Sequence, residues 1–262
     1  MPKYLVGDTN DTWDFYQAYK ACNPGDTIEL KEGFYLYLDN GYFSVDKDIT
    51  IEGHINIEDN TNYYTSKIIG RLDITNGVNV NINNLWLEIN NRNSNIINLN
   101  QNSTLSLYTV VIDRPDSVKI SSNDDKYPEI YVKENSNLIM NYVYTFDKKD
   151  LYSEIYITDL TLDINNSNLN SKLYLESSKV KINNSSIKKY YSNALSIGRT
   201  DLEIQNSTIE GGNVSKNYPC IFAEKSSINS TKNTIIQQNY SGAFYLVGNS
   251  YLNSYEDIIS FQ

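Results

Sequence analysis

A short pattern that recurs along the chain constrains the fold more than any other feature of the sequence. In each copy two apolar residues stand two positions apart, an Asn follows four positions after the first, and a further apolar residue follows seven positions after it. The clearest copies are Val80–Leu87, Leu162–Leu169, Val180–Ile187 and Leu202–Ile209, and weaker ones begin at Leu105, Leu138, Ile228 and Leu252. Successive copies begin 18 to 33 residues apart. Repeats of this length with strand-like alternation are typical of a solenoid, whose early apolar pairs face one shared core.

The asparagines of this pattern predict where each coil turns. Asn84, Asn166, Asn184 and Asn206 hold the same place in the four clearest copies. Asn tolerates the left-handed backbone region and hydrogen-bonds its own backbone, so we expect a turn at each of them. Because the coils stack, we also expect an asparagine ladder in which each side-chain amide bonds the next.

The N-terminal segment predicts a cap on the first coil. Helical spacing of apolar residues within Asp11–Cys22 indicates a short helix, with Asp11 or Thr12 as its N-cap. Asn23-Pro24-Gly25 ends the helix, and a strand is expected at Thr27–Leu30.

This opening, AYKACNPGDTIELKEGFY, together with DITIEG at Asp48–Gly53, resembles that of the pectin-lyase-like superfamily. The resemblance implies an all-β, single-stranded right-handed parallel β-helix with a short N-terminal capping helix. We expect one domain over residues 1–262, with the cap in 1–26 and about ten coils in 27–262. The longest insertions, Glu58–Lys67 and Pro115–Tyr127, are the kind of solenoid loop that often carries binding. No cap is evident at the C-terminal end, so an oligomer contact there is possible.

Composition excludes several classes of function. A net charge of −10 argues against nucleic acid, because phosphate contacts need clustered Lys and Arg. No stretch is long and apolar enough for membrane insertion. The single histidine, His54, and the two cysteines, Cys22 and Cys220, argue against zinc sites and disulfide frameworks. No signal peptide is visible, so a cytoplasmic location is expected unless a leader is missing from this sequence.

One outward-facing row on the first strand of each coil is the main functional candidate. It comprises Glu29, Ser44, Asp73, Asn98, Tyr131, Tyr156, Tyr174, Ser196, Phe222 and Tyr245. The second half is mostly aromatic, and three tyrosines fall on consecutive coils. Such rings stack on the C–H faces of sugars. The alternative is that the rings stabilise the sheet or meet a partner subunit.

Two catalytic interpretations compete with simple binding. The resemblance implies that a lyase would use clustered acids, Ca²⁺ and a basic residue, for which Arg71 and Asp73, near Glu29 and Asn98, are the candidates. No cofactor is otherwise expected. The sequence IDRPD at Ile112–Asp116 is only faintly similar to a pectate-lyase motif, and a turn or salt bridge explains it as well.

A glycosidase would instead need two neighbouring carboxylates, for which Glu129 and Glu154 are the candidates if both face outward on adjacent coils. The polygalacturonase motifs are not present as a set, and Asp124-Asp125 falls in an expected loop. Trp86 is expected to face outward between Leu85 and Leu87.

The leading hypothesis is a carbohydrate-interacting module that binds a glycan, or a partner, on the tyrosine-rich face. A polysaccharide lyase or glycoside hydrolase acting on the same face is the first alternative, so whether the protein is an enzyme stays open. The second alternative is a structural or oligomeric component of a surface or phage assembly. Oligomers would form through the tyrosine face or through the open C-terminal end.

Overall fold

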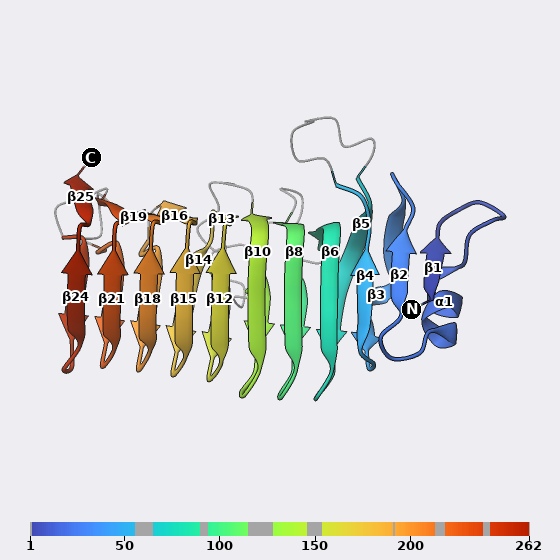
Figure 1. Cartoon of the computed structure of the whole chain (residues 1–262), viewed down its shortest axis with the longest axis horizontal. Helices are drawn as coiled ribbons and strands as arrows, with labels where there is room; N and C mark the ends of the chain where they lie inside the picture. Colours follow the sequence, from blue (N-terminus) through green and yellow to red (C-terminus); the bar gives the residue numbers. More distant parts are fainter. Residues whose placement is uncertain are drawn as a thin grey trace.

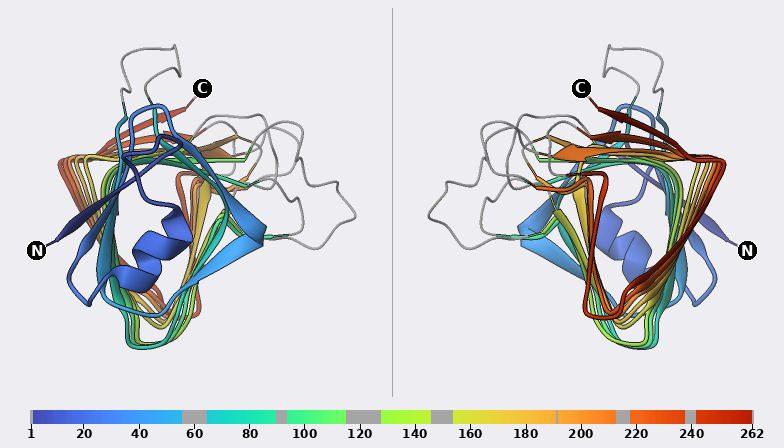
Figure 2. Two further views of the ribbon diagram at one scale, coloured as in Figure 1. Left: turned by 90° about the vertical axis from the view of Figure 1, so that its right-hand side faces the viewer. Right: turned by 90° about the vertical axis from the view of Figure 1, so that its left-hand side faces the viewer.

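The chain folds as a right-handed parallel β-helix, as the repeat and the resemblance predict. A computed structural model describes residues 2–55, 65–89, 94–114, 128–145, 154–190, 192–212, 218–237 and 242–261. Within these ranges the chain forms one helix and 25 strands, all joined in parallel pairings. The coils stack side by side along a rod (Figure 1) and superimpose around one axis in end-on view (Figure 2). The insertion Pro115–Tyr127, with Asp116 and Asp124-Asp125, and residues 58–64 lie outside the described ranges.

Each coil contributes to three parallel sheets. The first sheet contains the C-terminal parts of β3 (Tyr35–Val45) and β5 (Lys67–Ile74), then β7 (Ile97–Leu99), β9 (Ile130–Val132), β11 (Glu154–Thr158), β14 (Lys172–Glu176), β17 (Leu195–Gly198), β20 (Ile221–Glu224) and β23 (Phe244–Val247). The second sheet contains β1 (Lys3–Val6), β2 (Thr27–Leu30), β4 (Ile49–Glu52), the N-terminal parts of β6 (Asn79–Glu88), β8 (Thr104–Asp113) and β10 (Asn137–Thr145), then β12 (Thr161–Asn165), β15 (Lys179–Asn183), β18 (Asp201–Gln205), β21 (Ser227–Thr231) and β24 (Tyr251–Tyr255). The third sheet contains the remaining parts of β3, β5, β6, β8 and β10, with β13 (Asn168–Leu169), β16 (Ser186–Tyr190), β19 (Thr208–Gly212), β22 (Thr234–Gln237) and β25 (Ile258–Phe261).

The strand Thr27–Leu30 exists where predicted but belongs to the second sheet. Its residue Glu29 pairs with Glu52 of β4 rather than with Ser44 of the first-sheet row. The prediction that Glu29 begins that row was therefore wrong. The physical reason is that the chain enters β2 directly from the N-terminal cap, so the first coil has no first-sheet strand.

The cap is the helix α1 (Phe15–Ala21), which lies across the N-terminal end of the rod (Figure 2). Its N-cap is Asp14, whose carboxylate accepts the backbone N–H groups of Tyr16 and Gln17, so the prediction of Asp11 or Thr12 was wrong. Phe15 is buried and packs edge-on against Phe43, with ring centroids 5.0 Å apart. The helix thus covers the apolar end of the first coils.

Inward aliphatic side chains from the three sheets form one continuous core. The first-sheet pairs predicted from alternation are buried along most of the rod; Ile155 and Ile157, for example, are fully buried. Burial decreases in the last coil, where the inward residues Leu246 and Ile259 are 36% and 46% exposed. No helix among the described residues is long and apolar enough to cross a membrane.

The predicted turns are present, but the ladder between coils is formed by the residue that follows the left-handed residue at each corner, which is a serine up to Ser207 and then Asn233. Asn84, Asn166, Asn184 and Asn206 all have positive φ, between 47° and 53°, and the side chains of the last three are exposed. The following residue makes the bonds between coils: Ser167 N–H donates to Ser185 Oγ, and Ser185 N–H donates to Ser207 Oγ, each at 3.1 Å. The asparagine ladder predicted at these four positions was therefore wrong, because Asn166, Asn184 and Asn206 expose their side chains at the corner. Amide bonds between coils occur instead at neighbouring positions, where Asn183 Nδ2 donates to Asn165 Oδ1 at 3.2 Å.

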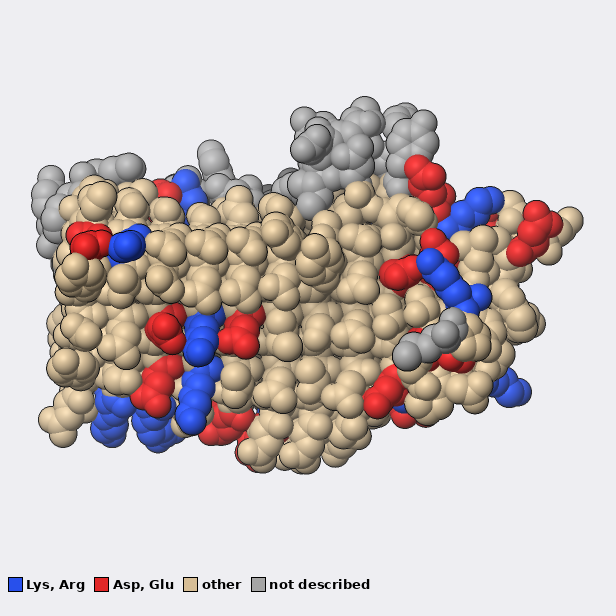
Figure 3. Space-filling model, in the orientation of Figure 1, with Lys and Arg blue, Asp and Glu red and all other residues tan. Residues whose placement is uncertain are grey.

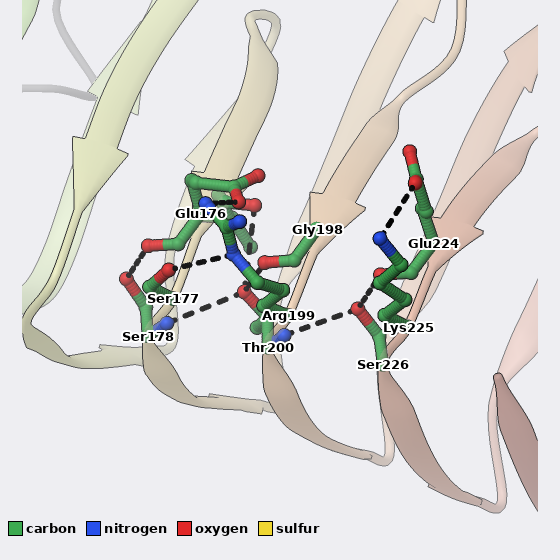
Figure 4. A network of polar contacts seen from close by, with 10 residues as sticks. Glu176, Ser177, Ser178, Gly198, Arg199, Thr200, Glu224, Lys225 and Ser226 are labelled. Carbon is green, nitrogen blue, oxygen red and sulfur yellow. Dashed lines mark hydrogen bonds and ion pairs between the residues drawn. The ribbon is translucent and has the colours of Figure 1, made fainter. Parts of the chain in front are cut away.

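A second row of hydroxyls follows the other corner of the coils (Figure 4). The N–H of Ser178 donates to Thr200 Oγ1 at 3.4 Å, and the N–H of Thr200 donates to Ser226 Oγ at 3.1 Å. Each hydroxyl also donates to the carbonyl two residues earlier, as Thr200 does to Gly198 at 2.8 Å. At these two of the three corners, side chains therefore satisfy buried backbone groups by a bond to the next coil.

Candidate functional site

The outward row of the first sheet has the register that alternation predicted from Ser44 onward. Adjacent coils align its members in the order Ser44, Asp73, Asn98, Tyr131, Tyr156, Tyr174, Ser196, Phe222 and Tyr245. The aromatic members Tyr131, Tyr156, Tyr174, Phe222 and Tyr245 are called the aromatic row here. They come from β9, β11, β14, β20 and β23, so one sheet positions all five.

The three consecutive tyrosines stack on one another. Ring centroids of Tyr131 and Tyr156 are 5.8 Å apart with an interplanar angle of 17°, and those of Tyr156 and Tyr174 are 4.7 Å apart at 6°. All three are half-buried. Burial, followed by the neighbouring Tyr174, Tyr131 and Glu176, raises the pKa of Tyr156 above its usual value. Because each ring covers part of its neighbour, the faces that stacking leaves uncovered are those at the two ends of the stack; Lys172 Nζ lies 5.9 Å from the centre of the Tyr174 ring.

Ser196 interrupts the aromatic row between Tyr174 and Phe222. Beyond it, Phe222 and Tyr245 form a second stack, with centroids 5.8 Å apart at 22°. Tyr245 is 53% exposed, whereas Ser196 and Phe222 are half-buried. The face therefore consists of two ring stacks separated by one small residue.

Charged side chains flank the aromatic row in pairs of opposite sign. Glu154 and Lys172 are 3.8 Å apart on the N-terminal side of the strands. At the opposite end, Arg199 Nη2 is 2.6 Å from Glu176 Oε1, and Lys225 is 3.7 Å from Glu224 (Figure 4). The Glu176 carboxylate lies over Gly198, where a Cβ atom would overlap it. Gly198 therefore leaves the space that this carboxylate occupies.

The predicted catalytic residues Arg71 and Asp73 form an ion pair in the polar half of the row. Arg71 Nη2 is 2.9 Å from Asp73 Oδ2, and the guanidinium carbon lies 5.2 Å from the centre of the Tyr42 ring. Asn98 donates to the other Asp73 oxygen at 2.8 Å. Glu29 is not in this cluster; it contacts Lys3 and His54 on the second sheet. Within the described ranges no three His, Cys, Asp or Glu residues are grouped to hold a metal ion.

The predicted carboxylate pair, Glu129 and Glu154, has two different environments. Glu154 begins β11, is half-buried and pairs with Lys172. Glu129 precedes β9 and is only 5% exposed, and its Oε2 accepts a hydrogen bond from Ser171 at 2.7 Å. A role for either in catalysis stays a prediction.

On the third sheet, a lysine ammonium lies near two aromatic rings, of which the sequence analysis named only Trp86. Trp86 is half-buried on the outer side of β6, as predicted, between the buried Leu85 and Leu87. The Lys67 ammonium lies 4.3 Å from the Trp86 ring centre and 5.2 Å from that of Tyr35. Sequence reasoning missed Lys67 because its partners lie 32 residues before it and 19 after it. Aligning the third strands of adjacent coils would have placed Tyr35, Lys67 and Trp86 at the same outward position.

Charges on the second sheet also alternate in sign between adjacent strands. Figure 3 shows Lys side chains over β15 with acidic side chains on both sides, over β12 and β18. They are Lys179, Lys181, Asp163, Asp201 and Glu203. Lys181 and Glu203 are 3.9 Å apart and well exposed, so this patch contributes little to stability.

Comparisons with known proteins find a similarity among solved structures only. No protein family model and no curated protein match the chain. Among solved structures the chain is similar to a pectin methylesterase from carrot, with 14% sequence identity and a TM-score of 0.44. The alignment covers 99% of this chain and 83% of the carrot protein. At that level of similarity nothing about the site is transferred from the carrot protein.

Proposed function

We propose that this β-helix is a carbohydrate-binding module that holds a neutral glycan on its first sheet, through the aromatic row. The observation that supports the proposal is the register of five aromatic side chains on one face, none of them fully buried. Aromatic rings combine an apolar surface with, in tyrosine, a hydroxyl that can bond sugar hydroxyls. The open ring faces and edges of this row are therefore suited to a sugar chain.

The electrostatics of the flanks favour a neutral glycan. Beside the row, Lys172, Arg199 and Lys225 are each paired with a carboxylate, whereas Lys133, just after β9, is exposed. Apart from Lys133, the described cations near a bound uronate are already paired, so the carboxylates of Glu154, Glu176 and Glu224 would repel it. Neutral oligosaccharides are therefore the expected ligands, and a polyanion would need added Ca²⁺.

The proposal does not extend to hydrolysis or elimination. Glu154 pairs with Lys172, and Glu129 is buried with Ser171 against it, so neither carboxylate is presented openly beside the aromatic row. Subunit contact through the same face is the other outcome that the experiment must separate from glycan binding.

A glycan array combined with sedimentation tests the proposal. Replacing both Tyr156 and Tyr174 with Ala should weaken binding of neutral oligosaccharides by about 1–2 kcal/mol, because it removes the centre and one free face of the stack. The matched control replaces Tyr108 and Tyr142, an exposed ring pair at another corner with centroids 5.5 Å apart, and should bind as the parent does. If the parent binds no neutral glycan but forms an oligomer that the first variant dissociates, the face is a subunit contact and the proposal fails.

A further inference from the structure

We propose that the interruption at Ser196 is a subsite that takes one neutral pyranose ring between Tyr174 and Phe222. The inference rests on the proposed function and names the sugar that the face would select. Tyr174, Ser196 and Phe222 occupy the same outward position on three successive strands, β14, β17 and β20. The two aromatic side chains thus face each other across a single small residue.

The spacing of the strands matches one intervening ring. Two strand steps of about 4.8 Å place the walls roughly 10 Å apart. A ring halfway between them would lie about 5 Å from each wall, within the 4.5–7 Å at which ring systems pack. Elsewhere in the same row, one-step neighbours have centroids 4.7 and 5.8 Å apart. A sugar at Ser196 would therefore continue the stack that Tyr131, Tyr156 and Tyr174 begin.

The base and one side of the subsite present groups that can bond sugar hydroxyls. Among the described residues, the hydroxyl of Ser196, which is half-buried, has no hydrogen-bond partner. On the same strand Gly198 carries no side chain, and the Glu176 carboxylate lies over it, held by Arg199. Glu176 has a second oxygen that can accept from a sugar hydroxyl, and its negative charge disfavours a uronate.

The two walls select the stereochemistry of the ring. A β-linked glucose unit carries all its ring substituents equatorially, so both of its faces present C–H groups. Galactose places its 4-oxygen axially, so one face would set a polar substituent, the glycosidic oxygen in a 1,4-linked chain, against an aromatic wall without a partner. We therefore expect the subsite to prefer gluco-configured chains over galacto-configured ones.

The test fills the subsite with a tyrosine side chain, the commonest side chain of the aromatic row. Ser196→Tyr should complete the aromatic stack, retain or raise the melting temperature, and weaken binding of cellotetraose by about tenfold or more. The matched control is Ser44→Tyr, the same substitution in the same outward row at the N-terminal end, which should bind as the parent does. Calorimetric titration of both variants and the parent with cellotetraose and β-1,4-galactotetraose measures the effect and the preference.

The possible results separate this proposal from the broader one. Loss of cellotetraose binding in Ser196→Tyr, with parent-like binding in Ser44→Tyr, supports the subsite. Unchanged binding in Ser196→Tyr, or tighter binding of galactotetraose by the parent, overturns the subsite while leaving glycan binding on the face intact. No binding of any neutral glycan by the parent overturns both. A parent dimer that Ser196→Tyr dissociates would assign the gap to an aromatic side chain of a second copy, and would overturn the sugar subsite.

Discussion

At the scale of single residues, the corners of the coils divide two tasks between adjacent side chains. Asn184 adopts the left-handed conformation, which costs other residues with a Cβ about 1–2 kcal/mol. Ser185 then satisfies buried backbone groups, accepting from Ser167 N–H and donating to the carbonyl of Asn183 at 2.7 Å. The neighbours are therefore not interchangeable, although both are small and polar.

Ser185→Ala should lower the free energy of unfolding by about 1–3 kcal/mol, because it leaves the buried N–H of Ser167 without an acceptor. The control is Ser186→Ala, one residue later and half-buried on the outer face, which should change stability by less than about 0.5 kcal/mol. Urea denaturation of both variants gives the comparison. Equal losses at the two positions would refute the serine ladder.

At the scale of strands, a two-residue alternation determines which side chains enter the core. In β11, Ile155 and Ile157 are fully buried while Tyr156 between them is half-buried beside the tyrosines of the adjacent coils. Strand ends follow the alternation less well, since Glu129, immediately before β9, is buried and accepts a hydrogen bond from Ser171. Side chains at the ends of short strands are governed by the loops around them.

Ile155→Asp should cost several kcal/mol, because it places an unpaired carboxylate in the core of the rod. Ile258→Asp is the matched control: that side chain is 64% exposed in β25, so the same substitution should be close to neutral. Thermal unfolding followed by circular dichroism compares the two. A parent-like melting temperature for Ile155→Asp would contradict the strand register.

At the scale of the whole molecule, the two ends of the described rod differ in how well the core is covered. Helix α1 covers the N-terminal coils, whereas the last coil leaves Leu246 and Ile259 partly exposed. In a solenoid each coil is stabilised mainly by its neighbours, so damage at one end spreads only gradually along the rod.

Phe15→Ala should destabilise the N-terminal coils by about 3–5 kcal/mol, because Phe15 is buried against Phe43 beneath the cap. Hydrogen exchange should accelerate most in β2 and β4 and least in β18. Ile259→Ala in the last described coil, where the side chain is 46% exposed, serves as the control and should leave exchange in β2 and β4 unchanged. Uniform acceleration along the rod in Phe15→Ala would show that the molecule unfolds as one unit.

Much of this architecture is determined by residues close together in the chain and can therefore be predicted from the sequence. Alternation with a period of two predicted the inward pairs and the outward row from Ser44 to Tyr245. Positive φ at Asn166, Asn184 and Asn206 was predicted because Asn tolerates that conformation. These features depend on residues within about eight positions of one another.

Tertiary structure decided what depends on contacts between coils. It assigned Glu29 to the second sheet, gave the corner ladder to Ser167, Ser185 and Ser207, and buried Glu129 against a serine 42 residues away. It also stacks the tyrosine rings face to face, so the ring faces left uncovered by stacking are those at the ends of the stack. Side-chain direction across coils is determined by packing against residues about 20 to 40 positions away, and a local pattern carries no record of those neighbours.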